Sequence, residues 1–121
     1  MKTKKTLIIG ASTDNTRYAY KAAERLISFG HSIVNVGNKT GEVAGVPIEP
    51  AKEIHDDIDT ITLYIGPQHQ RLLYSYILRT NPKRLIFNPG AENKELEKLA
   101  ADKGILTESA CTLVLLATGQ Y

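Results

Sequence analysis

The residues best suited to chemistry lie in one short loop near the N-terminus. Gly10-Ala11-Ser12 follows an apolar run at residues 7–9, and Arg17 stands where a helical pattern begins. Small residues let a ligand approach the backbone, and the free N–H groups and dipole of a helix N-terminus favour a bound phosphate. A cation is unfavourable against the helix dipole at this end, so Arg17 either pairs with an anion or is a solvated side chain. The loop therefore predicts an anion site.

The elements around this loop follow an alternating pattern of short apolar runs and helical stretches. Repeated strand–helix–strand units with short connections form a parallel sheet with right-handed crossovers. We therefore expect an α/β fold: a single Rossmann-like, doubly wound, mostly parallel sheet of five strands with helices on both faces. The segment 42–50 holds Gly45 and two prolines and follows directly on Gly41, so it is predicted to be a loop with a short extended piece at 46–48. The five predicted strands are residues 7–9, 32–36, 60–65, 84–87 and 105–107.

The helices are predicted from apolar positions spaced three and four residues apart. The first covers about residues 16–29, with Thr13 or Asp14 as N-cap, and the third covers 93–103. The terminal run 111–117 is apolar on all sides and could be a helix or a strand; we favour a helix with Ser109 as N-cap. The positions expected to face the core are Ala19, Ala22, Ala23 and Leu26 in the first helix, Leu72, Leu73, Tyr76 and Ile77 after Pro67, and Leu96, Leu99 and Ala100 in the third.

Composition limits the class of protein. A chain of 121 residues with 42% hydrophobic and 23% charged residues is typical of one folded domain, which we place at residues 1–121. The net charge of +2 is small, so nucleic acid is not an expected partner, and neither is a membrane. The basic residues 2–5 resemble the start of a signal peptide, but the apolar run that follows is too short. With one cysteine, Cys111, a cytoplasmic protein is expected.

Glycines mark the ends of the predicted strands. Gly10, Gly37, Gly66 and Gly90 each lie at or just beyond a carboxyl end, and Pro67 follows one of them as the first residue of a helix. Doubly wound sheets bind ligands in the crevice outside the carboxyl ends of their strands. Each glycine alone suits an ordinary turn, but four at one edge of the sheet indicate a binding site.

The residues after the second strand restrict the ligand. A dinucleotide fingerprint would place glycines at Ser12 and Asn15, and an NAD site would place an acidic residue near the end of that strand. Asn38 and Lys39 stand there instead. A lysine suits an additional ribose phosphate, which NADP carries at the 2′ position and coenzyme A at the 3′ position.

An ordered set of short motifs resembles the family of CoA-binding domains. These are Gly10-Ala11-Ser12, Arg17-Tyr18, Gly30-His31, Asn38-Lys39, Glu42-Val43-Ala44-Gly45, Asn88-Pro89-Gly90 and Cys111. Members of the family are small cytoplasmic proteins similar to the nucleotide-binding domain of the succinyl-CoA synthetase alpha subunit. The resemblance implies a sheet that holds the nucleotide end of coenzyme A or an acyl-CoA. It also implies that the loop residues and Arg17 surround the pyrophosphate and that Lys39 lies near the 3′-phosphate.

No catalytic constellation or metal-ligand spacing is found. His31, His55 and His69 lie far apart, and Ser12 lacks the context of a serine nucleophile. Cys111 is either a small buried residue or a thiol activated at a helix N-terminus. We therefore expect a non-catalytic CoA-binding module or sensor. The alternatives are an NADP-binding oxidoreductase-like domain and a scaffold or subunit with a vestigial site; a homodimer or a partner protein stays open.

Overall fold

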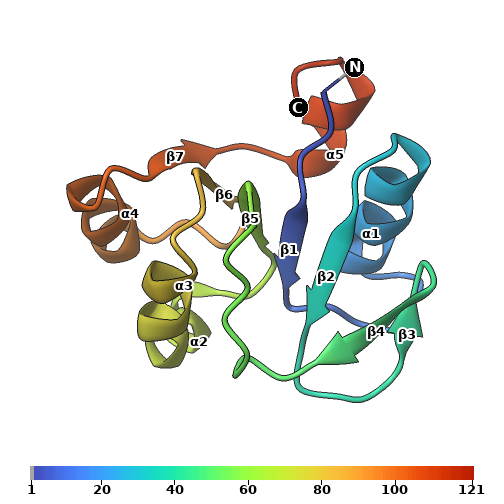
Figure 1. Ribbon diagram of the computed structural model, residues 1–121, viewed down its shortest axis with the longest axis horizontal. Helices are drawn as coiled ribbons and strands as arrows, with labels where there is room; N and C mark the ends of the chain where they lie inside the picture. The colour runs from blue at the N-terminus through green and yellow to red at the C-terminus, as the bar shows by residue number, and fades with distance from the viewer. Residues whose placement is uncertain (1) are drawn as a thin grey trace.

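The computed structural model describes residues 2–121, and the strands in this range form one sheet of seven (Figure 1). The order is β3-β4-β2-β1-β5-β6-β7, with every neighbouring pair parallel except β3 and β4. The mostly parallel α/β sheet predicted from the sequence is thus confirmed. The strands are β1 Thr6–Ile9, β2 Ile33–Val36, β3 Glu42–Val43, β4 Val46–Glu49, β5 Thr60–Leu63, β6 Arg84–Phe87 and β7 Leu106–Ser109.

The prediction of five strands was wrong, because residues 42–49 form a hairpin that extends the sheet. Ala44 and Gly45 have φ angles of 53° and 80°, which suit a two-residue hairpin turn. The side chain of the fully buried Asn35 in β2 donates to the carbonyl oxygens of Val43 and Val46, each at 3.1 Å. A side chain of the preceding strand therefore stabilises a hairpin whose glycine and proline indicated a loop.

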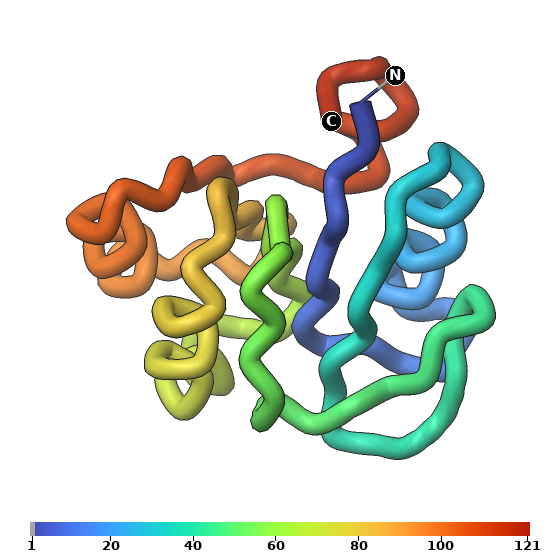
Figure 2. Tube along the Cα trace, in the orientation of Figure 1, coloured from blue at the N-terminus to red at the C-terminus, as the bar shows by residue number. Residues whose placement is uncertain are grey.

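Helices cover both faces of the sheet, as expected. Leu26 of α1 and Leu116 of α5 pack on one face, and Ile77 of α3 and Leu96 of α4 pack on the other. Figures 1 and 2 show α1 lying apart from the group formed by α2, α3 and α4. The helices are α1 Tyr18–Ser28, α2 Pro67–Gln70, the 3₁₀ helix η1 Arg71–Leu73, α3 Tyr74–Thr80, α4 Lys94–Asp102 and α5 Thr112–Ala117.

Several helix details differ from the sequence prediction. The C-terminal helix is confirmed as α5, but Ser109 ends β7, and the N-cap of α5 is Cys111, which makes no side-chain capping hydrogen bond. Leu72 is 90% exposed because the 3₁₀ turn η1 interrupts the helix after Pro67 and changes which side faces the core. Leu99 is 37% exposed, so the inward face of α4 is narrower than predicted.

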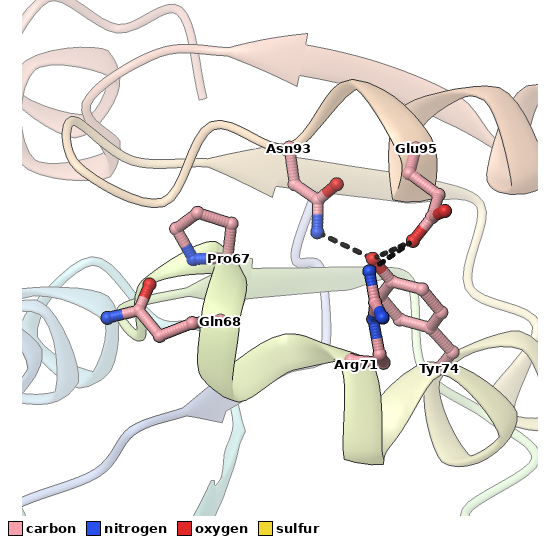
Figure 3. Close-up of a pocket in the computed structure, with 6 residues that line it drawn as sticks. All are labelled: Pro67, Gln68, Arg71, Tyr74, Asn93 and Glu95. Atoms are coloured by element: carbon pink, nitrogen blue, oxygen red, sulfur yellow. Dashed lines mark hydrogen bonds and ion pairs between the residues drawn. The ribbon is translucent and has the colours of Figure 1, made fainter.

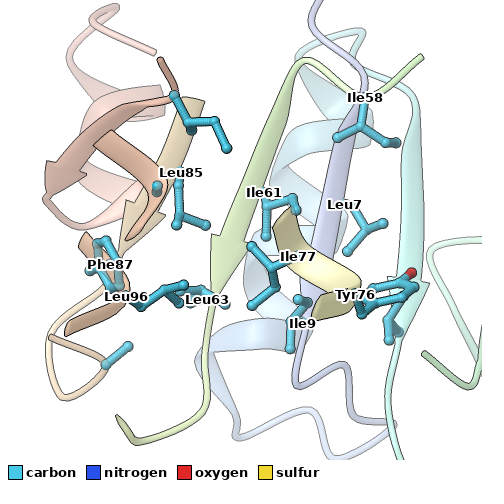
Figure 4. Packing of buried hydrophobic residues seen from close by; sticks show 14 of the residues in the cluster. Leu7, Ile9, Ile58, Ile61, Leu63, Tyr76, Ile77, Leu85, Phe87 and Leu96 are labelled. Carbon is cyan, nitrogen blue, oxygen red and sulfur yellow. The ribbon is translucent and has the colours of Figure 1, made fainter. Parts of the chain in front are cut away.

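The larger core cluster lies between the sheet and α3 and α4 (Figure 4). Successive side chains of a strand point to opposite faces, so alternate residues of β1, β5 and β6 enter this cluster. They are Leu7, Ile9, Ile61, Leu63, Leu85 and Phe87, all 0–1% exposed. Burying a leucine or isoleucine side chain contributes about 1.5–3 kcal/mol, so this layer is the main support of the strands that carry the loops described below.

The amino ends of the strands are closed by Tyr121, which returns to the start of β1 (Figure 2). Its carbonyl oxygen accepts hydrogen bonds from the side chains of Lys4 at 2.6 Å and Arg84 at 2.9 Å. The Arg84 guanidinium lies 4.4 Å from the centre of the Tyr121 ring, and the His31 ring lies 5.0 Å from it. We call these four residues the tyrosine clasp.

Candidate functional site

A cleft of about 670 Å³ runs along the carboxyl ends of β1, β2, β5 and β6; we call it the rim cleft. It lies where α1 leads from β1 to β2 on one side, while β5, which follows the β3–β4 hairpin, joins β1 on its other side. Such a change of direction opens a crevice in a doubly wound sheet. The predicted site residues that line it are Gly10, Ala11, Ser12, Arg17, Tyr18, Gly37, Asn38, Lys39, Gly66 and Gly90.

Two predicted site residues lie elsewhere. Pro67 opens α2 beside the rim cleft and lines a neighbouring cleft. Cys111 is half-buried at the N-cap of α5 and is not among the residues lining either cleft. The geometry thus separates the single thiol from the glycine loops that precede it in the sequence.

Close backbone packing accounts for two of the glycines. A Cβ atom on Gly37 would lie 2.6 Å from the carbonyl oxygen of Ala11, so no larger residue fits without moving the backbone. Gly10 has a φ of 98°, and a Cβ there would lie 2.9 Å from the Ile65 side chain. The loops after β1, β2 and β5 are therefore packed directly against one another at the base of the rim cleft.

The start of α1 differs from the predicted anion site in detail. The N-cap is Arg17, without a side-chain capping bond, and not Thr13 or Asp14. The N–H groups of Gly10 and Ala11 both donate to the Val36 carbonyl oxygen at 2.9 Å, so they are not free for a ligand.

Asp14 shapes the loop before the helix. Its carboxylate accepts hydrogen bonds from the hydroxyl and N–H of Thr16, and these bonds, the hydroxyl first, hold the pKa of Asp14 below its ordinary value. Among residues 2–121, no hydrogen bond engages the N–H groups of Ser12 and Tyr18. These two groups, unlike those of Gly10 and Ala11, are backbone donors available to an anion.

Two exposed cations stand over this part of the rim cleft. The Arg17 side chain is 73% exposed and its ion pair is with Asp14, at 3.9 Å. Lys39 is exposed and makes no ion pair or hydrogen bond with the described side chains. Exposed pairs at such distances contribute little to stability, so both charges are available to a ligand.

Sequence reasoning missed the apolar side of the rim cleft. Ile65, Leu72 and Leu73 line it together with Tyr64. Burial raises the pKa of Tyr64 to about 12, and its hydroxyl has no hydrogen-bond partner among the described residues. The one signal in the sequence was position: Tyr64 and Ile65 end the third predicted strand, and Leu72 and Leu73 lie in the helix predicted after Pro67. His69, which follows Pro67 in the same stretch of chain, also lines the cleft.

A second cleft, of about 480 Å³, lies between α2, η1 and the start of α4; we call it the side cleft (Figure 3). Its lining residues are Pro67, Gln68, Arg71, Tyr74, Asn93 and Glu95, and Gln68 also lines the rim cleft. In Figure 3 the polar ends of Arg71, Tyr74, Asn93 and Glu95 converge on one point. The two clefts are thus neighbours on the same rim of the sheet.

Two features are absent from the described part of the chain. No group of three or more His, Cys, Asp or Glu side chains within residues 2–121 is placed to hold a metal ion. None of the helices in this range is long and apolar enough to cross a membrane.

Comparison with known proteins agrees with this geometry. A family model described as a CoA binding domain matches residues 4–117. A crystal structure of an uncharacterized protein is 50% identical, covers 100% of both chains and superposes with a TM-score of 0.97. A hypothetical protein from Pyrococcus horikoshii OT3 is 26% identical with a TM-score of 0.82, over 91% of this chain and 79% of that chain.

A more distant structure supports the fold alone. A Thermus thermophilus protein, cell-free ID.343, is 21% identical with a TM-score of 0.81, over 98% of this chain and 90% of that chain. Among curated proteins no match was found.

Proposed function

Because the chain belongs to the CoA-binding domain family, we propose that it binds coenzyme A or an acyl-CoA in the rim cleft and acts as a binding module or sensor. This proposal depends on one observation: two exposed cations, Arg17 with only a long ion pair and Lys39 with none, lie next to the closely packed glycine loops. Coenzyme A carries a pyrophosphate and a separate 3′-phosphate, so it offers two anionic groups to two separate cations.

The proposed pose follows the order of the strands. Lys39 follows β2 and receives the 3′-phosphate, while Arg17 and the N–H groups of Ser12 and Tyr18 receive the pyrophosphate next to β1. The ligand then continues past Gly66, which follows β5. The uncharged parts of the ligand can pack against the apolar side of the rim cleft, formed by Ile65, Leu72 and Leu73.

The test is a comparison of ligands on the unmodified protein. A ligand present at about a hundred times its dissociation constant stabilises the folded protein by about 2.7 kcal/mol, which thermal denaturation detects readily. CoA should raise the melting temperature more than NADP, NAD or ATP. Equal shifts for all four, or no shift for any, would contradict the proposal. A larger shift with NADP would favour an oxidoreductase-like domain, because a lysine at position 39 also suits a 2′-phosphate.

Location in the cytoplasm belongs to the same proposal. A single half-buried cysteine without a disulfide partner suits a reducing compartment. Native mass spectrometry of protein purified without denaturant offers an independent check, since a co-purifying ligand of CoA mass would identify the occupant of the cleft.

A further inference from the structure

The side cleft stands at the far end of the path that the proposed ligand follows. It lies beside the loops after β5 and β6, whereas Lys39 follows β2, on the other side of β1. Gln68 lines both clefts, so the two clefts adjoin at this side chain. The volume of about 480 Å³ lies within the range of small-molecule pockets, roughly 300–1,000 Å³.

One wall of the side cleft is organised by a buried amide. Gln70 is 0% exposed, and its Nε2 donates to the carbonyl oxygens of Ile65 at 2.9 Å and Ala91 at 2.7 Å. Its Oε1 accepts from Asn93 Nδ2 at 3.0 Å, and the same Nδ2 donates to Tyr74 Oη at 2.8 Å. These bonds hold the loops after β5 and β6 together. The bond from Asn93 also fixes the orientation of the Tyr74 hydroxyl before any ligand binds.

The Tyr74 hydroxyl holds the acidic side chain of the cleft. It donates to Glu95 Oε1 at 2.9 Å, while Arg71 Nη2 approaches the same oxygen only to 3.7 Å (Figure 3). The Arg71 side chain is 76% exposed and donates no hydrogen bond to another of the described residues. Such an exposed, long ion pair is worth little, and Glu95 keeps its bond to Tyr74 if Arg71 turns away. Arg71 can therefore exchange Glu95 for an incoming anion at small cost.

We infer that the side cleft receives the acyl group of an acyl-CoA and selects acyl groups that end in a carboxylate. This inference rests on the proposed CoA site. The Arg71 guanidinium pairs with that carboxylate, with a planar fork of donors that matches its two oxygens. The carboxamide of Gln68 lies between the two clefts, where the thioester end of the ligand passes from one to the other.

The experiment compares two thioesters of equal chain length. Glutaryl-CoA and valeryl-CoA both carry five-carbon acyl groups, but the first ends in a carboxylate and the second in a methyl group. Titration calorimetry on the unmodified protein should give glutaryl-CoA an affinity about fivefold higher than valeryl-CoA, which is the effect of one partly exposed ion pair. Arg71→Gln should abolish this preference by lowering the affinity for glutaryl-CoA to that for valeryl-CoA.

Two further variants sharpen the assignment. Glu95→Gln should raise the affinity for glutaryl-CoA about twofold, because it removes the competing carboxylate. Arg79→Gln removes the same charge from an exposed position of α3 outside both clefts and should retain the full preference. Equal binding of both thioesters by a protein that binds CoA would overturn this inference and leave the CoA site standing. A protein that binds neither CoA nor any thioester would overturn both.

Discussion

The two ends of the parallel sheet use their cations in opposite ways. At the amino end, Lys4 and Arg84 both bond to the Tyr121 carbonyl oxygen, and the Arg84 side chain is only 9% exposed. At the carboxyl end, the Arg17 side chain is 73% exposed, and its ion pair with Asp14 spans 3.9 Å. Lys39 is exposed and has no partner among the described side chains. The same residue types thus close one end of the molecule and leave the other end open.

The difference shows that exposure and bonding, more than residue type, decide what a charge can do. A buried charge must be paired to be tolerated, so the tyrosine clasp is a structural device whose loss affects folding. An exposed charge contributes little to folding and is ready to bind an anion. Substitutions at the two ends should therefore separate stability from ligand binding.

The largest effect is expected at the amino end. Arg84→Met removes a buried guanidinium that bonds to Tyr121, Thr60 and Glu108, and it should lower the free energy of unfolding by about 3 kcal/mol. CoA affinity of the folded variant should stay within a factor of two. Urea denaturation and calorimetry measure the two quantities, with the exposed Arg79→Met as the matched control. A variant that loses CoA binding but not stability would break the comparison.

The next effect is expected at Arg17. Arg17→Ala should weaken CoA binding by about 2 kcal/mol, the value of a hydrogen bond to a charged group, with unfolding free energy changed by less than about 0.5 kcal/mol. Its pair with Asp14 is too long and exposed to stabilise the fold. The same two measurements serve here, and a drop in stability with unchanged affinity would make Arg17 structural.

A smaller effect is expected at Lys39, where the ligand itself supplies the control. CoA should bind about 1 kcal/mol more tightly than dephospho-CoA, because an exposed lysine adds one partly screened contact to the 3′-phosphate. Lys39→Ala should remove that difference. If the difference survives in the variant, another residue holds the 3′-phosphate.

The smallest effect is a pH dependence that belongs to the amino end. Burial, followed by the charges of Lys4 and Arg84, lowers the pKa of His31 from its ordinary 6.5, and His31 Nδ1 accepts a hydrogen bond from the Lys4 N–H. The neutral form is therefore favoured in the folded protein. The stability that this pKa shift gives the folded protein is fully present above pH 6.5. It is lost as the pH falls from 6.5 through the lowered pKa of His31.

Thermal denaturation across this pH range provides the measurement. His31→Asn should flatten the decline, whereas His69→Gln, on the exposed rim, should leave the profile as in the unmodified protein. An unchanged profile in His31→Asn would assign the decline to another group.

Much of the architecture could be predicted because it depends on local patterns. The apolar runs at 7–9, 60–65 and 84–87 predicted the central strands, and Ala19, Ala23 and Leu26 gave the buried side of α1. Short connections between them required parallel pairing, so the glycine loops had to meet at one edge. The gathering of ten predicted site residues in the rim cleft follows from that topology; their role in binding is still a prediction.

The remaining features depend on contacts between distant parts of the chain. The hairpin at 42–49 needs the buried amide of Asn35, and the exposure of Leu72 results from a 3₁₀ turn that its own spacing does not reveal. The side cleft likewise depends on Gln70 and Asn93, which lie 23 residues apart and meet only in the folded chain.

By itself, the sequence determined five of the seven strands, the main helices, how the central parallel strands connect, and where a ligand crevice must open. These follow from hydrophobic periodicity and chain length, which act locally. Only the tertiary structure decided which cations are buried in internal hydrogen bonds and which are exposed and available to a ligand. Arg84 lies in a strand and Arg17 beside a helix. Tyr121, 37 residues beyond Arg84, packs on the Arg84 guanidinium, whereas the Arg17 side chain is 73% exposed and its ion pair is with the nearby Asp14. Long-range packing sets the burial of a charge, and no local pattern records it.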